Sequence, residues 1–440
     1  MITSAVRFRI AATAGAAIAG LVAVLLWPVS KSPSQRDPEP STSEVRYRFD
    51  VQATKSDIDE AIDAGEARQK QRSDDPIEMN ELANLYFARA QLDGDRRDFD
   101  AAEKLARRSL ELLPTPNGAI LTLAKLANAR HEFREAIDLA QHYQGRNATA
   151  VPMVLATAYL ALGDLPAAAE AADRAVRAKP IPSTYLERAL VRQAQGQDVD
   201  AEADFAHAVR VEDYGDVLES ARVRALWARF LVRRGNYRGA KRVIDEALRI
   251  APGNALALSI RAELELRTGD TKAARTDLEQ AFLAQHQVRY LIDEARVLDV
   301  SGDRAGANAL RKQVEGIVRD DLKEGGFGHR LELVEVLVDE GEPAGLVEAV
   351  AMARGELARR PAAETRFQLA RALACTGNFD EAHDQIEAAL ATGAKEPQYY
   401  ELAARLARKR NETDGAQHYA DLADSVDPAH GRWRSIGMPR

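Results

Sequence analysis

The stretch RRGNYRGAKRVIDEALRIAP, residues 233–252, contains the pattern that decides the fold. A glycine is followed by a polar residue, and an alanine stands five positions after the glycine. The same arrangement returns in ALGDLPAAAEAADRAVRAKP (161–180), RTGDTKAARTDLEQAF (267–282) and CTGNFDEAHDQIEAAL (375–390). A sequence that repeats itself every few tens of residues predicts an array of small units that stack on their neighbours, rather than one compact core.

The alanine of this pattern recurs along most of the chain. Its positions, mostly 32 to 34 residues apart with two longer gaps of 39 and 42, are Ala102, Ala136, Ala168, Ala201, Ala240, Ala274, Ala307, Ala349, Ala382 and Ala416. A second alanine stands twelve positions before most of them, at Ala124, Ala156, Ala189, Ala228, Ala262, Ala295, Ala370 and Ala404. Two small residues in each unit indicate where two antiparallel helices touch, because the side chains at a contact set the distance between helix axes.

These residues resemble the tetratricopeptide repeat family. In the unit 221–254, the positions that match its consensus are Trp227, Ala228 and Leu231 on the first helix, Gly235, Asn236 and Tyr237 at the turn, Ala240, Ile244, Ala247 and Leu248 on the second helix, and Pro252 at the exit. The resemblance implies an all-α, right-handed superhelical solenoid of about ten helix pairs over residues 76–430, followed by a tail at 431–440. It also implies protein binding rather than catalysis.

An uncharged, apolar run at residues 10–29 follows a short N-terminal segment, residues 1–9, that contains Arg7 and Arg9. Its length of about 20 residues matches one helical crossing of a bilayer. Trp27 stands at the far end, where interfacial aromatic residues anchor transmembrane helices. The sequence therefore predicts an uncleaved signal anchor that forms one transmembrane helix.

The predicted orientation of the chain in the membrane depends on few charges. Arg7, Arg9 and the amino terminus stand on one side of the run, and Lys31 and Arg36 stand on the other. Positive residues favour the cytoplasmic side, so we expect the bulk of the chain outside the cytoplasmic membrane, in the cell envelope. The alternative is a cleaved signal peptide and a soluble periplasmic protein, since Ala-Ile-Ala at 17–19 fits a cleavage site.

Residues 30–56 are predicted to form a linker, because they are rich in proline and serine and cannot bury apolar surface. Within them, VRYRFDV at 45–51 alternates apolar and charged residues, which indicates a short extended segment. That segment either lies along its own chain or pairs with a second protein. Ser56 and Asp59 resemble a capping box that opens a helix at 57–75.

The formal net charge of −8 argues against a general nucleic-acid binder, which would carry a basic stripe. The single cysteine, Cys375, allows no disulfide within the chain. The eight histidines are dispersed and none stands at metal-ligand spacing, so we expect no metal, no cofactor and no catalytic site. Cys375 has Arg371 one helical turn before it, but an inert cysteine is the favoured interpretation over a reactive thiolate.

By resemblance, the first helix of each pair lines a concave groove. The residues that this places in the partner-binding groove are Leu186, Leu190, Arg222, Arg229, Arg233, Arg289, Arg296, Phe367, Arg371, Arg405, Arg408 and Lys409, with Met153, Thr157, Glu263 and Glu401 among the other groove positions. The early part is apolar and the later part is basic, which would suit acidic segments of a partner or a C-terminal carboxylate. The alternative is an ordinary solvated helix face.

Anchor, linker and solenoid together predict a membrane-bound scaffold or adaptor that holds other proteins within a cell-envelope assembly. The alternative function is a periplasmic holdase chaperone, or a helper subunit of an envelope enzyme complex, that uses the apolar early groove.

Overall fold

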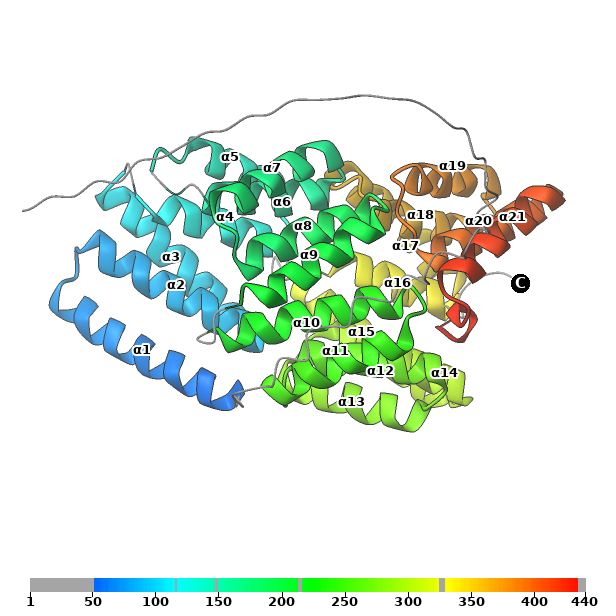
Figure 1. The fold of residues 1–440 in the computed structure, drawn as a ribbon, viewed down its shortest axis with the longest axis horizontal. Coiled ribbons are helices and arrows are strands. Elements are labelled where there is room, and N and C mark those ends of the chain that lie inside the picture. The colour runs from blue at the N-terminus through cyan, green and yellow to red at the C-terminus, as the bar shows by residue number, and fades with distance from the viewer. Residues whose placement is uncertain are drawn as a thin grey trace, which may run out of the picture. The chain divides into compact units, whose positions relative to one another are not determined.

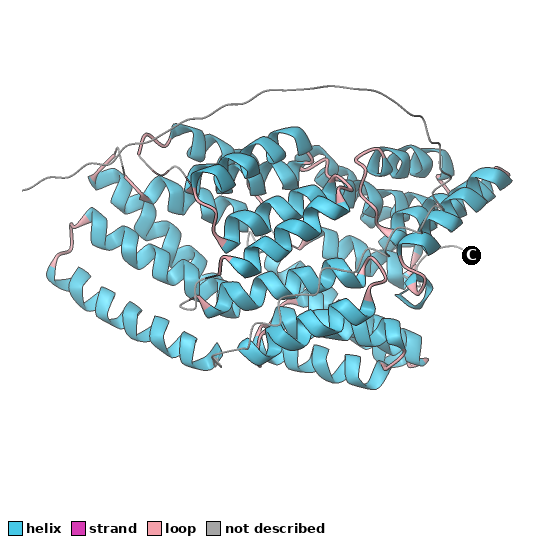
Figure 2. Cartoon of the chain, viewed as in Figure 1, coloured by secondary structure: helices cyan, strands magenta, loops and turns pink. Residues whose placement is uncertain are grey.

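The computed structural model describes residues 51–114, 117–145, 147, 149–212, 216–323 and 329–433. The chain falls into two compact units, residues 1–39 and 40–440, and every described residue belongs to the second. Within the described ranges there are 21 α-helices, one short 3-10 helix at His430–Trp433, and no strand (Figure 2). The prediction of an all-α helical array is confirmed.

After α1 (Val51–Gln71), the helices form ten successive pairs, which we number as repeats 1 to 10 (Figure 1). The pairs are α2 (Pro76–Asp93) with α3 (Arg96–Leu112), α4 (Ala119–Ala129) with α5 (Phe133–His142), α6 (Ala150–Leu162) with α7 (Leu165–Ala178), α8 (Pro182–Ala194) with α9 (Asp198–Arg210), α10 (Val217–Val232) with α11 (Tyr237–Ile250), α12 (Ala255–Thr268) with α13 (Thr271–Ala284), α14 (Val288–Ser301) with α15 (Arg304–Lys323), α16 (Arg330–Glu340) with α17 (Pro343–Arg359), α18 (Ala363–Cys375) with α19 (Phe379–Leu390), and α20 (Pro397–Lys409) with α21 (Thr413–Val426).

The repeated alanines lie where the helices touch. Nine of the ten second-helix alanines have no exposed surface, and the tenth, Ala416, is 3 % exposed. In repeat 8 the first-helix alanine is replaced by Val334, which is also fully buried. A small side chain at these positions lets two helices approach closely, and a larger one would overpack the contact.

A left-handed residue ends the first helix of every pair. In eight repeats it is a glycine with φ between 68° and 97°, at Gly94, Gly163, Gly196, Gly235, Gly269, Gly302, Gly341 and Gly377. Repeats 2 and 10 have His131 (φ 59°) and Asn411 (φ 62°) instead. A residue with a Cβ pays about 1 to 2 kcal/mol for this conformation, and asparagine tolerates it best.

His131→Gly is expected to make the protein less sensitive to acid. Burial, followed by the charge of Arg360, lowers the pKa of His131 to about 4 from its ordinary 6.5. The folded state therefore resists a proton that the unfolded state accepts, so this histidine's contribution to stability is present above pH 6.5 and is lost as pH falls toward 4. The loss is about 2 to 3 kcal/mol. The free energy of unfolding, measured with urea at several pH values between 7 and 4, should fall less steeply with decreasing pH for the variant than for the wild-type protein.

Asn411→Gly is the matched control, because it relaxes the same backbone position without removing a group that titrates in this range. Its gain should be the same at every pH. If the His131→Gly curve ran parallel to the wild-type curve, the assignment of acid sensitivity to His131 would be wrong.

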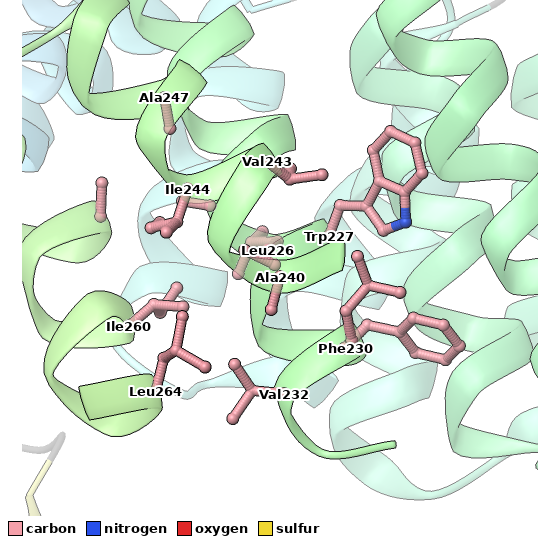
Figure 3. Packing of buried hydrophobic residues seen from close by; sticks show 14 of the residues in the cluster. Leu226, Trp227, Phe230, Val232, Ala240, Val243, Ile244, Ala247, Ile260 and Leu264 are labelled. Carbon is pink, nitrogen blue, oxygen red and sulfur yellow. The ribbon is translucent and has the colours of Figure 1, made fainter. Parts of the chain in front are cut away.

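The largest apolar cluster surrounds α10. Trp227 is 2 % exposed, and its ring is stacked with Phe205 of α9 at a centroid distance of 6.4 Å. Figure 3 shows Trp227 and Phe230 on one side of this helix and Ile260 and Leu264 of the next repeat on the other. Each repeat thus completes the core of its neighbours, as expected for an array whose single units are too small to fold alone.

The turns of repeats 1 to 5 also lie against segments 190 to 225 residues later in the chain. The contacts are Arg96 with Asp321 at 3.5 Å, Gln285 Nε2 donating to Gln91 O at 3.1 Å, Arg134 donating to Ala358 O at 3.4 Å, Lys395 with Asp198 at 3.3 Å, and the Tyr237 hydroxyl donating to Asp427. We call these the cross-array contacts. They follow the chain in order, so the first five repeats run beside the last five.

Two cross-array contacts bring backbone against backbone. A Cβ on Gly196 would lie 2.0 Å from the carbonyl oxygen of Gly393, and one on Gly163 would lie 3.0 Å from that of Pro361. Both distances are shorter than a normal non-bonded contact, and a backbone oxygen cannot move aside as a side chain can. Two features therefore require glycine at position 196: its left-handed φ of 70° and the close approach of the Gly393 carbonyl oxygen.

Only part of the N-terminal region for which we made predictions lies within the described residues. The first helix begins at Val51 rather than at 57, so Ser56 lies inside α1 and does not cap it. The predicted transmembrane helix at residues 10–29 and most of the linker lie outside the described residues. Of the helices that are described, none combines the length and the apolarity needed to cross a membrane.

Candidate binding cavity

First helices of eight repeats line two adjoining chambers. The polar chamber, about 420 Å³, is lined by Arg229, Arg233, Leu256, Ser259, Ile260, Glu263, Gln287, Arg289, Tyr290, Asp293, Arg296, Glu335, Glu364, Phe367, Gln368, Arg371 and Gln398. The apolar chamber, about 310 Å³, is lined by Leu160, Gly163, Leu165, Leu190, Gln193, Ala194, Ala362, Ala363, Thr392, Ala394, Glu396 and Tyr399. Arg229, Arg233, Glu364 and Gln398 line both, and thus form their junction.

Helical periodicity explains how charged residues reach one wall. Arg289, Asp293 and Arg296 stand four and three positions apart on α14, which places them on one face of the helix. Arg296 pairs with Asp293 at 2.5 Å and also with Glu335 of α16, and Arg289 pairs with Glu335 at 2.8 Å. The wall of the polar chamber is therefore an alternating network of both signs.

Two further arginines of the wall are also paired. Arg371 is almost fully buried, and its guanidinium lies 2.6 Å from Asp339. Arg233 lies between Glu263 at 3.5 Å and Glu396 at 3.7 Å. Since Glu396 precedes α20 and Arg233 ends α10, the second of these pairs also ties repeat 5 to repeat 10.

Arg229 differs from these four. No ion pair joins its guanidinium to any described carboxylate, and its Nε is buried without a hydrogen-bond partner. Burial, and next the positive charge of Arg233, lowers the pKa of Arg229 to about 10. The group therefore remains charged at neutral pH without a carboxylate at ion-pair distance, although Glu263 and Glu396 interact with it from farther away. This is an unfavourable arrangement for a partly buried cation.

Glu364 is the opposite case. Its carboxylate accepts hydrogen bonds from Gln368 Nε2 at 2.9 Å and from the Tyr399 hydroxyl at 3.1 Å, but no described cation lies within ion-pair distance. Burial, with the nearby charge of Glu364, raises the pKa of the Tyr399 phenol well above its ordinary value, so the phenol remains a donor. One cation and one anion that form no ion pair with a described residue thus line the junction of the chambers.

Seven of the twelve predicted groove residues come together here: Leu190, Arg229, Arg233, Arg289, Arg296, Phe367 and Arg371. The other five lie elsewhere. Leu186 is 1 % exposed in the core, Arg222 pairs with Glu219 at 3.2 Å, Arg405 pairs with Glu401 at 2.5 Å, Arg408 is exposed, and Lys409 lies 6.0 Å above the Phe379 ring. A role for any of them in partner binding stays a prediction.

The expected basic stripe needs correction. The five arginines of the polar chamber share its wall with four carboxylates, those of Glu263, Asp293, Glu335 and Glu364. Most of the positive charge is therefore compensated. The sequence analysis placed Glu263 in the groove but did not name the other three acids, although Asp293 stands at helical spacing from two of the predicted arginines and could have been found by that signal.

Nothing in the described ranges gathers three or more His, Cys, Asp or Glu side chains into a metal site. Cys375 is partly buried, and burial raises the pKa of its thiol despite the nearby Arg371. A protonated thiol is a poor nucleophile, which supports the inert interpretation of this cysteine.

No family model matches the chain, and no curated protein matches it. Among solved structures, a tetratricopeptide repeat protein from Parabacteroides merdae is 17 % identical and aligns over 54 % of this chain and 91 % of its own, with a TM-score of 0.39. Yeast Tom70 is 13 % identical over 87 % of this chain and 92 % of its own, with a TM-score of 0.42. A human IFIT1 dimer with PPP-AAAA is 14 % identical over 82 % and 77 %, with a TM-score of 0.43.

At such identities and TM-scores, nothing that these proteins bind carries over to this chain. Its own residues are more informative. Ten helix pairs, a left-handed residue at each turn and a buried alanine in every second helix together define the fold. On these grounds, residues 76–426 form an α-helical solenoid of ten paired-helix repeats, which resemble tetratricopeptide repeats.

Proposed function

We propose that the chain is a non-enzymatic protein-interaction scaffold, held at a membrane by residues 10–29, that binds partner proteins through its helical array. The observation that carries the proposal is the array of ten stacked helix pairs, which gives the chain an extended surface built from repeated units. Arrays of this kind offer an extended surface without a catalytic centre. The apolar run and the linker of the sequence support attachment to the cytoplasmic membrane, with the array on its outer side.

Exposed cations are the better candidates for contact with a partner protein, because most arginines of the polar chamber are already paired. Arg408 and Lys409 end α20, are exposed, and have no ion pair with any described residue. Two adjacent cations at this end of the array would attract an acidic segment of a partner, through an interaction that weakens with salt.

Affinity capture of the full chain in mild detergent tests this function. Charge reversal of Arg408 and Lys409 to glutamate is expected to weaken recovery of at least one partner by tenfold or more, about 1.4 kcal/mol. The matched control reverses Arg177 and Lys179, two exposed cations at the end of the second helix α7 that also have no ion pair with any described residue. A scaffold is contradicted if no partner remains above background, or if both double variants recover the same proteins equally.

The same membranes test the anchor. The chain should stay with the membrane pellet after an alkaline carbonate wash, because a spanning helix is not removed by breaking ionic contacts. Release of the chain into the wash would contradict the anchor and favour a cleaved, soluble protein.

A further inference from the structure

Arg229 and Glu364, the two charged residues of the junction that form no ion pair with a described residue, line both chambers at once. They come from α10 and α18, and they do not pair with each other. The surrounding acids and arginines satisfy one another, so these two are the charges that a ligand can complement. A partly buried charge without an ion pair is unfavourable, and the binding of a ligand group of opposite charge would remove part of that cost.

We propose that the junction of the two chambers binds a small zwitterion with an apolar side chain, of the class of the free apolar amino acids. Its carboxylate lies on the guanidinium of Arg229, its ammonium group lies on the carboxylate of Glu364, and its side chain enters the apolar chamber beside Leu160 and Leu190. This inference goes beyond the proposed scaffold function and does not depend on it.

The charges of the junction favour a zwitterion over a simple anion or cation. An anion on Arg229 would lie near the carboxylates of Glu263 and Glu396, which interact electrostatically with Arg229. A cation on Glu364 would lie near Arg233, with which Glu364 interacts in the same way. A molecule with both charges gains a charge-assisted hydrogen bond at each end and adds no net charge to the site. Gln398, which also lines both chambers, can donate to the carboxylate or accept from the ammonium group.

The size and lining of the chambers fit a small ligand. Each volume, about 310 and 420 Å³, lies at the lower end of the range of small-molecule pockets, roughly 300 to 1,000 Å³. Leu160, Leu165 and Leu190 give the apolar chamber a wall for a branched aliphatic side chain. Burying such a side chain favours binding, because it removes apolar surface from water.

The apolar chamber is also built from both halves of the array. Gly163 and Leu190 belong to repeats 3 and 4, whereas Ala362 and Ala394 precede the first helices of repeats 9 and 10. A ligand there touches both sides of the cross-array contacts. Because it would bind only when the two sides are together, it should stabilise their association.

Calorimetric titration of the full chain in detergent with L-leucine tests the inference. Leucine should bind, and both N-acetyl-leucine, which lacks the ammonium group, and leucinamide, which lacks the carboxylate, should bind about 10- to 100-fold more weakly. Arg229→Met and Glu364→Gln should each weaken leucine binding by about the same 10- to 100-fold factor. Arg229→Lys should retain part of the affinity for leucine. Arg242→Met, an exposed change on the neighbouring helix α11 and outside both chambers, should leave it unchanged.

Helical content and thermal midpoint, measured for every variant, separate loss of the site from loss of the fold. The inference is overturned if leucine does not bind the wild-type chain, if N-acetyl-leucine or leucinamide binds as tightly as leucine, or if folded Arg229→Met keeps full affinity. Reversal of Arg408 and Lys409 should leave leucine binding intact, so failure of the scaffold and failure of this site are distinguishable.

Discussion

Trp227→Ala is expected to lower the free energy of unfolding of the central repeats by about 3 to 5 kcal/mol, the usual cost of removing a large buried aromatic side chain. Trp227 packs on Phe205 of the preceding repeat and belongs to the cluster that continues into α12. Its removal therefore weakens two interfaces between neighbouring repeats. In a repeat array the loss should be local, so hydrogen exchange of α9 to α12 should accelerate more than that of α2 to α5.

Trp227→Phe is the matched control. The indole N–H is buried without a hydrogen-bond partner, so its removal breaks no hydrogen bond and relieves one unsatisfied donor. Its cost should be well below that of the alanine change. A loss under about 1 kcal/mol for Trp227→Ala would show that the cluster does not couple the repeats.

Gly196→Ala is expected to break the backbone contact between repeat 4 and the segment before repeat 10. The added Cβ would lie 2.0 Å from the carbonyl oxygen of Gly393, so one segment must move away. The ion pair of Asp198 with Lys395, next to this contact, should be lost with it. Spin labels at Val199 and Asp380, in a Cys375→Ser background, should report a longer and broader distance distribution than in the parent.

Gly377→Ala separates the steric effect from backbone strain. Gly377 has the same position in repeat 9 and a φ of 82°, but nothing lies within 4 Å of its added Cβ. Both variants pay about 1 to 2 kcal/mol for a left-handed alanine, and only Gly196→Ala blocks a contact. Identical distance distributions in the two variants would contradict a structural role for the cross-array contacts.

The repeat itself could be predicted because it is local. A glycine and an alanine five positions apart encode a turn and a helix contact, and the structure has both at nearly every predicted place. His131 and Asn411 escaped the pattern because they occupy the left-handed position without being glycine. The start of α1 was also missed, since the sequence predicted a helix from 57 and the structure has it from Val51. Of the extended segment predicted at 45–51, only Val51 lies within the described residues.

The cavity could be predicted only in part. The resemblance to tetratricopeptide repeats identified Arg229 and Arg296, because it implies that their positions on the first helix of each pair face the groove. The sequence could not identify residues from distant repeats that line the same chamber, such as Glu364, which lines the junction together with Arg229. Contacts between residues more than 100 positions apart depend on the small rotation between each repeat and the next, accumulated over about five repeats. No single sequence motif determines this accumulated rotation.

The cross-array contacts also restrict how this gene can change. An open array tolerates duplication or loss of a repeat anywhere, since each unit touches only its neighbours. Here repeats 1 to 5 are matched in order with segments some 190 to 225 residues later. An inserted repeat would shift every later match by one unit, and Gly196 would no longer lie opposite Gly393. Copy number in the interior should therefore be conserved among descendants of this gene, and length variation should be confined to the two ends.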